Sequence, residues 1–136
     1  MNIDKQFLTV SNYNRPGTRR GSTIAVACHY IGNPGTSAQA NRNYFENLRT
    51  THTTKASAHY IIGLRGEVIQ MIPEEEISWC TNSANAYTIS IEACHPDATG
   101  KFTAATYAAY VELCADICKR WGLAVSYTHL RAHETL

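Results

Sequence analysis

The sequence predicts an α/β fold in which two helices pack against a mostly buried β-sheet. Short apolar runs bounded by glycine indicate buried strands, two longer segments repeat apolar residues at helical spacing, and the two kinds of segment alternate along the chain. The chain has 136 residues, of which 44% are hydrophobic and 17% are charged. That length and composition favour one compact domain over residues 1–136 and exclude a disordered chain.

The predicted strands are β-branched, apolar and short. The first is STIAVACHYI at 22–31, and a later one is YTISIEAC at 87–94. Between them, AHYIIG at 58–63 and EVIQMI at 67–72 are predicted to form a hairpin, with Gly66 adopting a positive φ in its turn. These runs supply the strands of the expected sheet.

Two helices are predicted from their caps and periodicity. Thr36 or Ser37 caps the first, and Thr103 caps the second. Apolar residues predicted to share a face in these helices are Ala40, Tyr44, Phe45 and Leu48, then Tyr107, Tyr110, Val111, Cys114, Ile117, Cys118 and Trp121. Residues 1–22 lack periodicity and are predicted to be an irregular arm, and the acidic run at 74–76 is predicted to be a solvated helix start.

Charge and composition exclude several classes of function. The 12 basic and 11 acidic residues leave a net charge of +1, and the scattered basic residues give no footprint for nucleic acid. The N-terminus has no basic segment followed by an apolar core, and no run approaches the ~18 apolar residues of a membrane span. The five cysteines lack the spacing of a secreted disulfide framework. We therefore expect a monomer made in the cytoplasm without a signal peptide, without membrane insertion and with its cysteines mostly reduced.

His29 and Glu92 are the residues whose positions suggest chemistry. Side chains alternate along a strand, so His29 and Cys28 point to opposite faces and are not expected to bind one metal ion together. Glu92 stands within an apolar strand, where an unpaired carboxylate costs several kcal/mol. Taken alone, His29 fits a hydrogen-bonded strand end and Glu92 fits an ion pair with Arg65 or Lys101. Together they match a metal hydrolase, in which histidine holds zinc and the carboxylate takes a proton from water.

Three stretches of the sequence resemble a known family. These are HYIGNPGTSAQANRNYFENL, ASAHYIIGLRGEVIQMIPEEEISWC and NAYTISIEACHPDATGKFT. Their order and spacing resemble the zinc-dependent N-acetylmuramoyl-L-alanine amidases of phage endolysins, which are relatives of the peptidoglycan recognition proteins. The resemblance runs from about Phe7 to Leu123. It implies a central mixed β-sheet flanked by helices, zinc as cofactor, and hydrolysis in peptidoglycan of the amide between N-acetylmuramic acid and L-alanine.

The resemblance also implies roles for individual residues. His29 corresponds to the first zinc ligand, and Glu92 to the catalytic glutamate that passes a proton from water to the leaving amine. His59 and Tyr60 match a wall of the substrate groove, and Trp79 falls where the family keeps an aromatic residue near the cleft. We therefore predict that these three side chains bind substrate.

The chain departs from the family at two places. Many relatives have histidine after the tryptophan, but this chain has Cys80, to which no role is assigned. Beyond the second helix the family supplies its second zinc ligand, a lysine and a third ligand, whereas residues 124–136 read AVSYTHLRAHETL. His133 is the predicted second ligand and His129 the alternative. This tail is either a divergent end that uses both histidines or, as we favour, foreign sequence after a truncation.

Three functions remain open from the sequence. The first is a zinc amidase that acts on the cell wall after release by holin or lysis. The second is a non-catalytic muropeptide-binding module of the same fold, which the missing third ligand favours and the retained Glu92 disfavours. The third is a cysteine peptidase that uses Cys94 or Cys28, whose signature would be inhibition by thiol alkylation but not by chelators.

Overall fold

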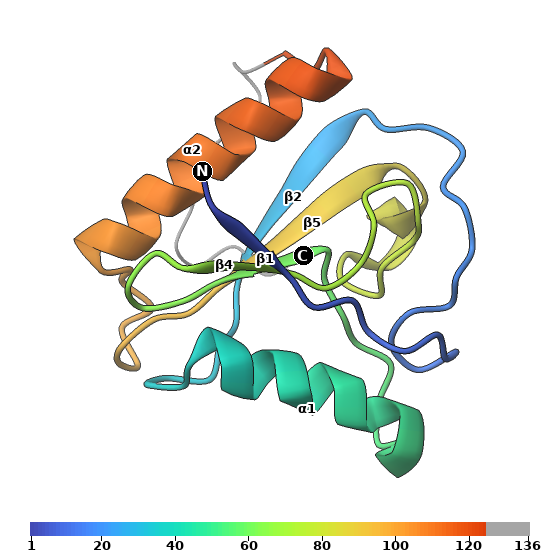
Figure 1. Cartoon of the computed structure of the whole chain (residues 1–136), viewed down its shortest axis with the longest axis horizontal. Coiled ribbons are helices and arrows are strands. Elements are labelled where there is room, and N and C mark those ends of the chain that lie inside the picture. The colour runs from blue at the N-terminus through green and yellow to red at the C-terminus, as the bar shows by residue number, and fades with distance from the viewer. Residues whose placement is uncertain (125–136) are drawn as a thin grey trace.

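A mixed β-sheet lies between two helices (Figure 1). The computed structural model describes residues 1–124 of the chain. Helix α1 (Ala38–Thr51) covers one face of the sheet and α2 (Ala104–Trp121) covers the other. The strands are β1 (Ile3–Lys5), β2 (Ala25–Tyr30), β3 (Tyr60–Ile62), β4 (Val68–Gln70) and β5 (Thr88–Ala93). This arrangement confirms the predicted α/β fold with a central mixed sheet.

The order of the strands places β5 beside both β2 and β3. The sheet runs β1-β4-β3-β5-β2, and β5 pairs in parallel with each of its neighbours. The register of β2 on β5 places His29 directly beside Glu92. Because paired residues on adjacent strands point to the same face of a sheet, these two side chains share a face.

The β3–β4 hairpin forms where it is predicted. The two strands are antiparallel, and Gly66 takes a φ of 80° in the turn. A Cβ at this position would lie 2.8 Å from the backbone carbonyl oxygen of Ala105, at the start of α2. Glycine is therefore required both by the backbone conformation and by the close approach of the second helix.

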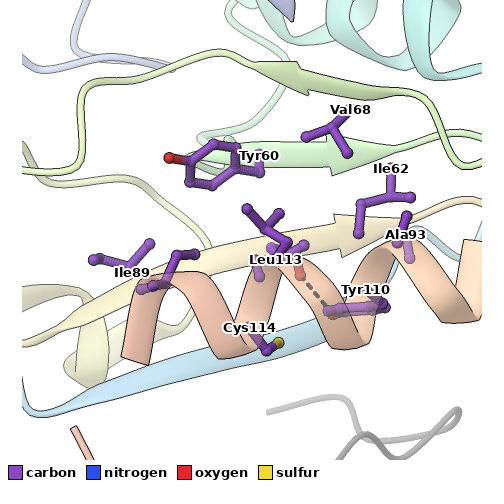
Figure 2. Packing of buried hydrophobic residues seen from close by; sticks show 11 residues of the cluster. Tyr60, Ile62, Val68, Ile89, Ala93, Tyr110, Leu113 and Cys114 are labelled. Carbon is purple, nitrogen blue, oxygen red and sulfur yellow. Dashed lines mark hydrogen bonds between the residues drawn. The ribbon is translucent and has the colours of Figure 1, made fainter. Parts of the chain in front are cut away.

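One core cluster joins the sheet to α2 (Figure 2). It contains Tyr60, Ile62, Val68, Ile89, Ile91, Ala93, Ala109, Tyr110, Leu113, Cys114 and Ile117. Within it, the Tyr110 hydroxyl lies 3.0 Å from the carbonyl oxygen of Ile91 and 2.8 Å from that of His29. Helix α2 thus holds together the two strands that carry the candidate site.

A second core cluster packs α1 against the opposite face. Its buried members are Leu8, Ala38, Phe45, Leu48, Ala58, Ile61, Ile69, Met71, Ile72 and Cys94. Of the two predicted caps, Thr36 and Ser37, the helix uses Ser37, whose hydroxyl accepts a hydrogen bond of 3.0 Å from the backbone N–H of Ala40. His29 and Glu92 point to this side of the sheet. Side chains alternate along a strand, and Ile91, which precedes Glu92 in β5, packs on the α2 side.

The buried faces of both helices are rotated from the predicted ones. In α1, Tyr44 is 51% exposed and Asn41 is buried; in α2, Tyr107 and Val111 are 51% and 45% exposed. The α2 interface instead includes Thr106, Ala109 and Leu113 beside the predicted Tyr110, Cys114, Ile117 and Cys118. The prediction was wrong here because apolar aromatic and β-branched residues occupy the solvent side, where hydropathy alone misplaces the face.

The prediction of an irregular arm over residues 1–22 was also partly wrong. Residues Ile3–Lys5 form β1, which pairs in parallel with β4 at the edge of the sheet. Asp4 and Lys5 are exposed, so this short strand carries no hydrophobic alternation that sequence analysis could detect. The pairing is decided by backbone hydrogen bonds to β4.

Candidate metal and catalytic site

Three side chains that could bind a metal ion meet beside the end of β5. The nearest potential ligand atoms of His29, Cys80 and Glu92 all lie within 4.8 Å of one another. His29 and Glu92 are brought together by the β2–β5 register, and Cys80 enters from the loop before β5. The structure thus joins two residues singled out from the sequence with a third that was assigned no role.

His29 is held from two sides. Its side chain is 6% exposed, its Nε2 lies 3.3 Å from the Thr81 hydroxyl, and its backbone carbonyl faces the Tyr110 hydroxyl. Cys28, the preceding residue, packs on the other side of the sheet with its Sγ 3.7 Å from the Sγ of Cys114. The expectation that these neighbours point apart is confirmed.

Glu92 is a half-buried residue whose carboxylate has one buried, unsatisfied oxygen. Its Oε1 accepts a hydrogen bond of 3.6 Å from the Cys80 thiol, while Oε2 is buried and has no hydrogen-bond partner within residues 1–124. Burial raises the pKa of Glu92 to about 8, against a small opposing effect of the Cys80 hydrogen bond. Arg65 instead pairs with Glu67, so the ion pair considered from the sequence does not form with that residue. An orphaned buried oxygen of this kind is stabilised by a cation.

The loop that presents Cys80 is anchored through its backbone. The Asn85 side-chain oxygen accepts hydrogen bonds from the backbone N–H groups of Cys80 (3.1 Å) and Thr81 (2.7 Å). Just before it, the Trp79 backbone N–H donates to the Ser57 hydroxyl at 2.9 Å, and the Ser57 N–H donates back to the Trp79 carbonyl at 3.0 Å. The departure from the family's histidine at this position was the signal in the sequence that could have identified Cys80.

A cavity of about 390 Å³ opens beside these groups. Its lining includes Glu92, Cys80, Trp79 and Lys55, together with Phe45, Ala56, Ser57, Asn82 and Asn85. The Trp79 indole N–H donates to the Asn12 carbonyl at 2.8 Å, and the Lys55 ammonium lies 5.7 Å from the centre of the indole ring. Trp79 is therefore a fixed aromatic wall at the position predicted for substrate binding.

The other two predicted substrate-binding residues lie inside the protein. His59 is 0% and Tyr60 2% exposed, and neither lines the cavity. The His59 Nδ1 accepts a hydrogen bond of 3.0 Å from the Ser90 N–H, so its Nε2 donates to the Glu76 carbonyl at 2.7 Å. Burial lowers the pKa of His59 to about 4, which keeps this ring neutral. The arrangement supports a structural role, in which His59 braces β5 two residues from Glu92, and does not support direct contact with a substrate.

Cys94 lacks the features of a catalytic thiol. It is 0% exposed, burial raises its pKa to about 12, and its Sγ accepts a hydrogen bond of 3.8 Å from the Asn41 amide. The adjacent His95 ring instead bonds the Gly32 N–H at 3.0 Å and lies 2.8 Å from the Asp97 carbonyl. Cys94 is therefore not positioned as a nucleophile activated by the adjacent His95, which disfavours the cysteine-peptidase alternative at this residue.

The fold and the site together are those of an α/β domain with a candidate metal centre. A histidine nitrogen, a thiol and a carboxylate are donors that zinc and similar divalent metals prefer, and here the thiol and the carboxylate line one cavity of an α/β domain. The chain belongs to the N-acetylmuramoyl-L-alanine amidase family, whose model matches residues 20–136. This match confirms the resemblance found in the sequence.

Named relatives agree with this assignment. The chain is 33% identical to N-acetylmuramoyl-L-alanine amidase CwlL of Bacillus licheniformis, over 91% of this chain and 38% of the length of CwlL. Among solved structures, a mutant endolysin from Bacillus subtilis is 26% identical with a TM-score of 0.76, covering 93% of this chain and 80% of its own. The catalytic domain of XlyA is 26% identical with a TM-score of 0.77, over 93% and 81% of the two chains.

Proposed function

We propose that this chain is the catalytic domain of a zinc-dependent amidase that cleaves the bond between N-acetylmuramic acid and L-alanine in peptidoglycan. The observation that carries this proposal is the pairing of His29 with Glu92 across β2 and β5, where Glu92 lines a cavity. The family and its named relatives supply the reaction. The chain spans 38% of the length of CwlL.

The residues at the site fit a zinc ion. His29 offers a ring nitrogen, and the unsatisfied Oε2 of Glu92 gives the site an uncompensated acceptor. Zinc, when bound, would polarise the scissile carbonyl and activate water for attack. His133 remains the predicted second ligand, and it lies outside the described residues, as does His129.

Glu92 is suited to move a proton. Its carboxylate lines the cavity beside the candidate metal site, where it can reach an attacking water and act as a general base. In the proposed reaction the Glu92 carboxylate takes a proton from the attacking water and then donates it to the nitrogen of the leaving L-alanine. The burial of the Glu92 Oε2 atom also keeps competing solvent away from this oxygen.

The cavity carries groups that complement peptidoglycan. Trp79 offers an indole face, which packs well against the apolar face of a sugar ring. Lys55 lies at the rim and is exposed, and it can pair with a carboxylate of the stem peptide.

We propose that the protein, as a monomer, reaches peptidoglycan in the cell wall after release by holin or lysis. No helix within residues 1–124 has the length and hydropathy to cross a membrane.

Lys55→Ala should weaken substrate binding without slowing the chemical step. An exposed charge pair contributes about 0.2–1 kcal/mol, so we expect KM for soluble muropeptide to rise about 1.4- to 5-fold while kcat is unchanged. Steady-state kinetics would measure both constants. Lys101→Ala, which removes an exposed lysine outside the cavity, should leave both unchanged. A fall in kcat for Lys55→Ala would contradict a role limited to binding.

The proposed function is tested by identifying the bond that is cut. Purified full-length protein is incubated with insoluble peptidoglycan, and newly exposed amino termini are labelled and identified. We expect N-terminal alanine, a loss of activity with a zinc chelator, and recovery on adding zinc. New reducing sugar ends, or other amino termini, would contradict the proposal. Saturable muropeptide binding without any cleavage would replace it with the binding-module alternative.

A further inference from the structure

We propose that Cys80 supplies a thiolate ligand to the metal ion bound by His29. The inference deepens the proposed function and rests on it, because it adds a ligand to the same metal site. It would give this chain a cysteine ligand from the loop before β5, at a position where the sequence departs from the family pattern.

The spacing of the donors supports this assignment. Zn–S and Zn–O or Zn–N bonds of about 2.3 and 2.0 Å, at a tetrahedral angle, place two ligand atoms about 3.5 Å apart. The Cys80 Sγ and the nearest potential ligand nitrogen of His29 lie within 4.8 Å of each other. Side-chain movements on the order of 1 Å would therefore bring Sγ and the His29 nitrogen to ligand spacing around one ion.

The charge balance of the site also favours a cation at this point. The unsatisfied Oε2 of Glu92 is buried within the same cluster. When a divalent ion binds, the Cys80 S–H bond breaks, its proton leaves to solvent, and a sulfur–metal bond forms without any change in oxidation state. Oε1 of Glu92 then loses the hydrogen bond that the thiol had donated to it, and the carboxylate, beside the cation, can act on water.

The loop that carries Cys80 is held in a fixed position beside the candidate metal site. The backbone N–H groups of Cys80 and Thr81 both bond to Asn85, so the loop needs little reordering to present the sulfur. The other four cysteines do not belong to the cluster of potential ligands. Cys28 makes the sharpest comparison, because it adjoins His29 in sequence yet packs against Cys114 on the opposite face.

The inference is tested by titrating the full-length, reduced, metal-free protein with Co²⁺ and recording absorption spectra. We expect wild-type protein to show a thiolate-to-cobalt charge-transfer band in the near ultraviolet. Cys80→Ser should lose this band and bind Co²⁺ at least about 10- to 100-fold more weakly, the loss typical of even an outer-shell partner. Cys28→Ser is the matched control and should keep both the band and the affinity.

A second measurement does not depend on the folding of any variant. Wild-type protein is treated with iodoacetamide with and without one equivalent of Zn²⁺, and the labelled cysteines are identified by peptide mass spectrometry. Coordinated thiolate is shielded, so zinc should slow the alkylation of Cys80 markedly and leave the rate at Cys28 unchanged. Circular dichroism establishes whether Cys80→Ser is folded before its spectrum is interpreted.

The possible outcomes separate this inference from the proposed function. If Cys80→Ser keeps the band, or zinc fails to protect Cys80, the thiolate assignment is overturned. If, in that case, His29→Ala still abolishes Co²⁺ binding, the zinc site of the proposed function stands without Cys80. Failure of the wild-type protein to bind Co²⁺ or Zn²⁺ would overturn both.

Discussion

Glu92→Gln is expected to abolish amide hydrolysis while leaving the protein folded. Glutamine has nearly the same shape but cannot accept and return a proton, and positioned acid–base groups contribute about 10²- to 10⁴-fold to rate. The substitution also replaces a carboxylate whose buried Oε2 has no hydrogen-bond partner within residues 1–124, so we expect little loss of stability. The release of N-terminal alanine from peptidoglycan would measure the activity, and thermal unfolding would measure the stability.

Glu75→Gln is a suitable control for this experiment. Glu75 is an exposed glutamate outside the cavity, so its substitution should leave the hydrolysis rate unchanged. Should Glu92→Gln retain activity within about tenfold of the wild type, the assignment of Glu92 as the main proton acceptor would be wrong. An inactive variant that melts far below the wild type would indicate instead that Glu92 supports the structure.

Glu74→Gln should cause a large loss of stability. The Glu74 carboxylate accepts two hydrogen bonds from Arg120, at 2.7 and 2.8 Å, one from the Trp121 indole at 2.9 Å and one from the Tyr60 hydroxyl at 2.6 Å. This group joins the end of α2 to β3. Breaking a buried charge pair costs about 3–5 kcal/mol, and because the Arg120 side chain is 44% exposed we expect about 2–3 kcal/mol.

The effect of Glu74 should depend on pH in a defined direction. Burial would raise the pKa of Glu74, but hydrogen bonds from Arg120, Tyr60 and Trp121 outweigh it and lower the pKa from 4.5 to about 2. A depressed carboxyl pKa contributes stability that is complete above the unfolded pKa and lost as pH falls through the folded one. The difference between wild type and Glu74→Gln should therefore be largest above about pH 4.5 and shrink towards pH 2.

Urea unfolding at several pH values would measure this difference. The neighbouring exposed residue offers a matched control, because Glu75→Gln should show little change at any pH. A stability difference for Glu74→Gln that is equal at pH 2 and pH 7 would show that the carboxylate charge is not its source.

Local signals in the sequence determined most elements of the fold. Strand alternation, the Ser37 and Thr103 caps and the turn glycine Gly66 each act within a few residues, so they can be recognised from the chain itself. The same alternation separated Cys28 from His29, and the placement of Glu92 in an apolar strand marked it as unusual. The family motifs added what local patterns lack, namely the expectation that His29 and Glu92 serve one reaction.

Tertiary structure alone decided the features that depend on distant partners. Cys80 joins the site because Asn85 and Ser57 hold its loop beside β5, and Glu74, predicted to be solvated, is buried because Arg120 and Trp121 reach it from α2. The exposure of Tyr107 and the pairing of β1 with β4 also depend on contacts with distant parts of the chain. Burial, register and desolvation are set by what packs against a residue from elsewhere in the chain, and local sequence carries no direct record of those contacts.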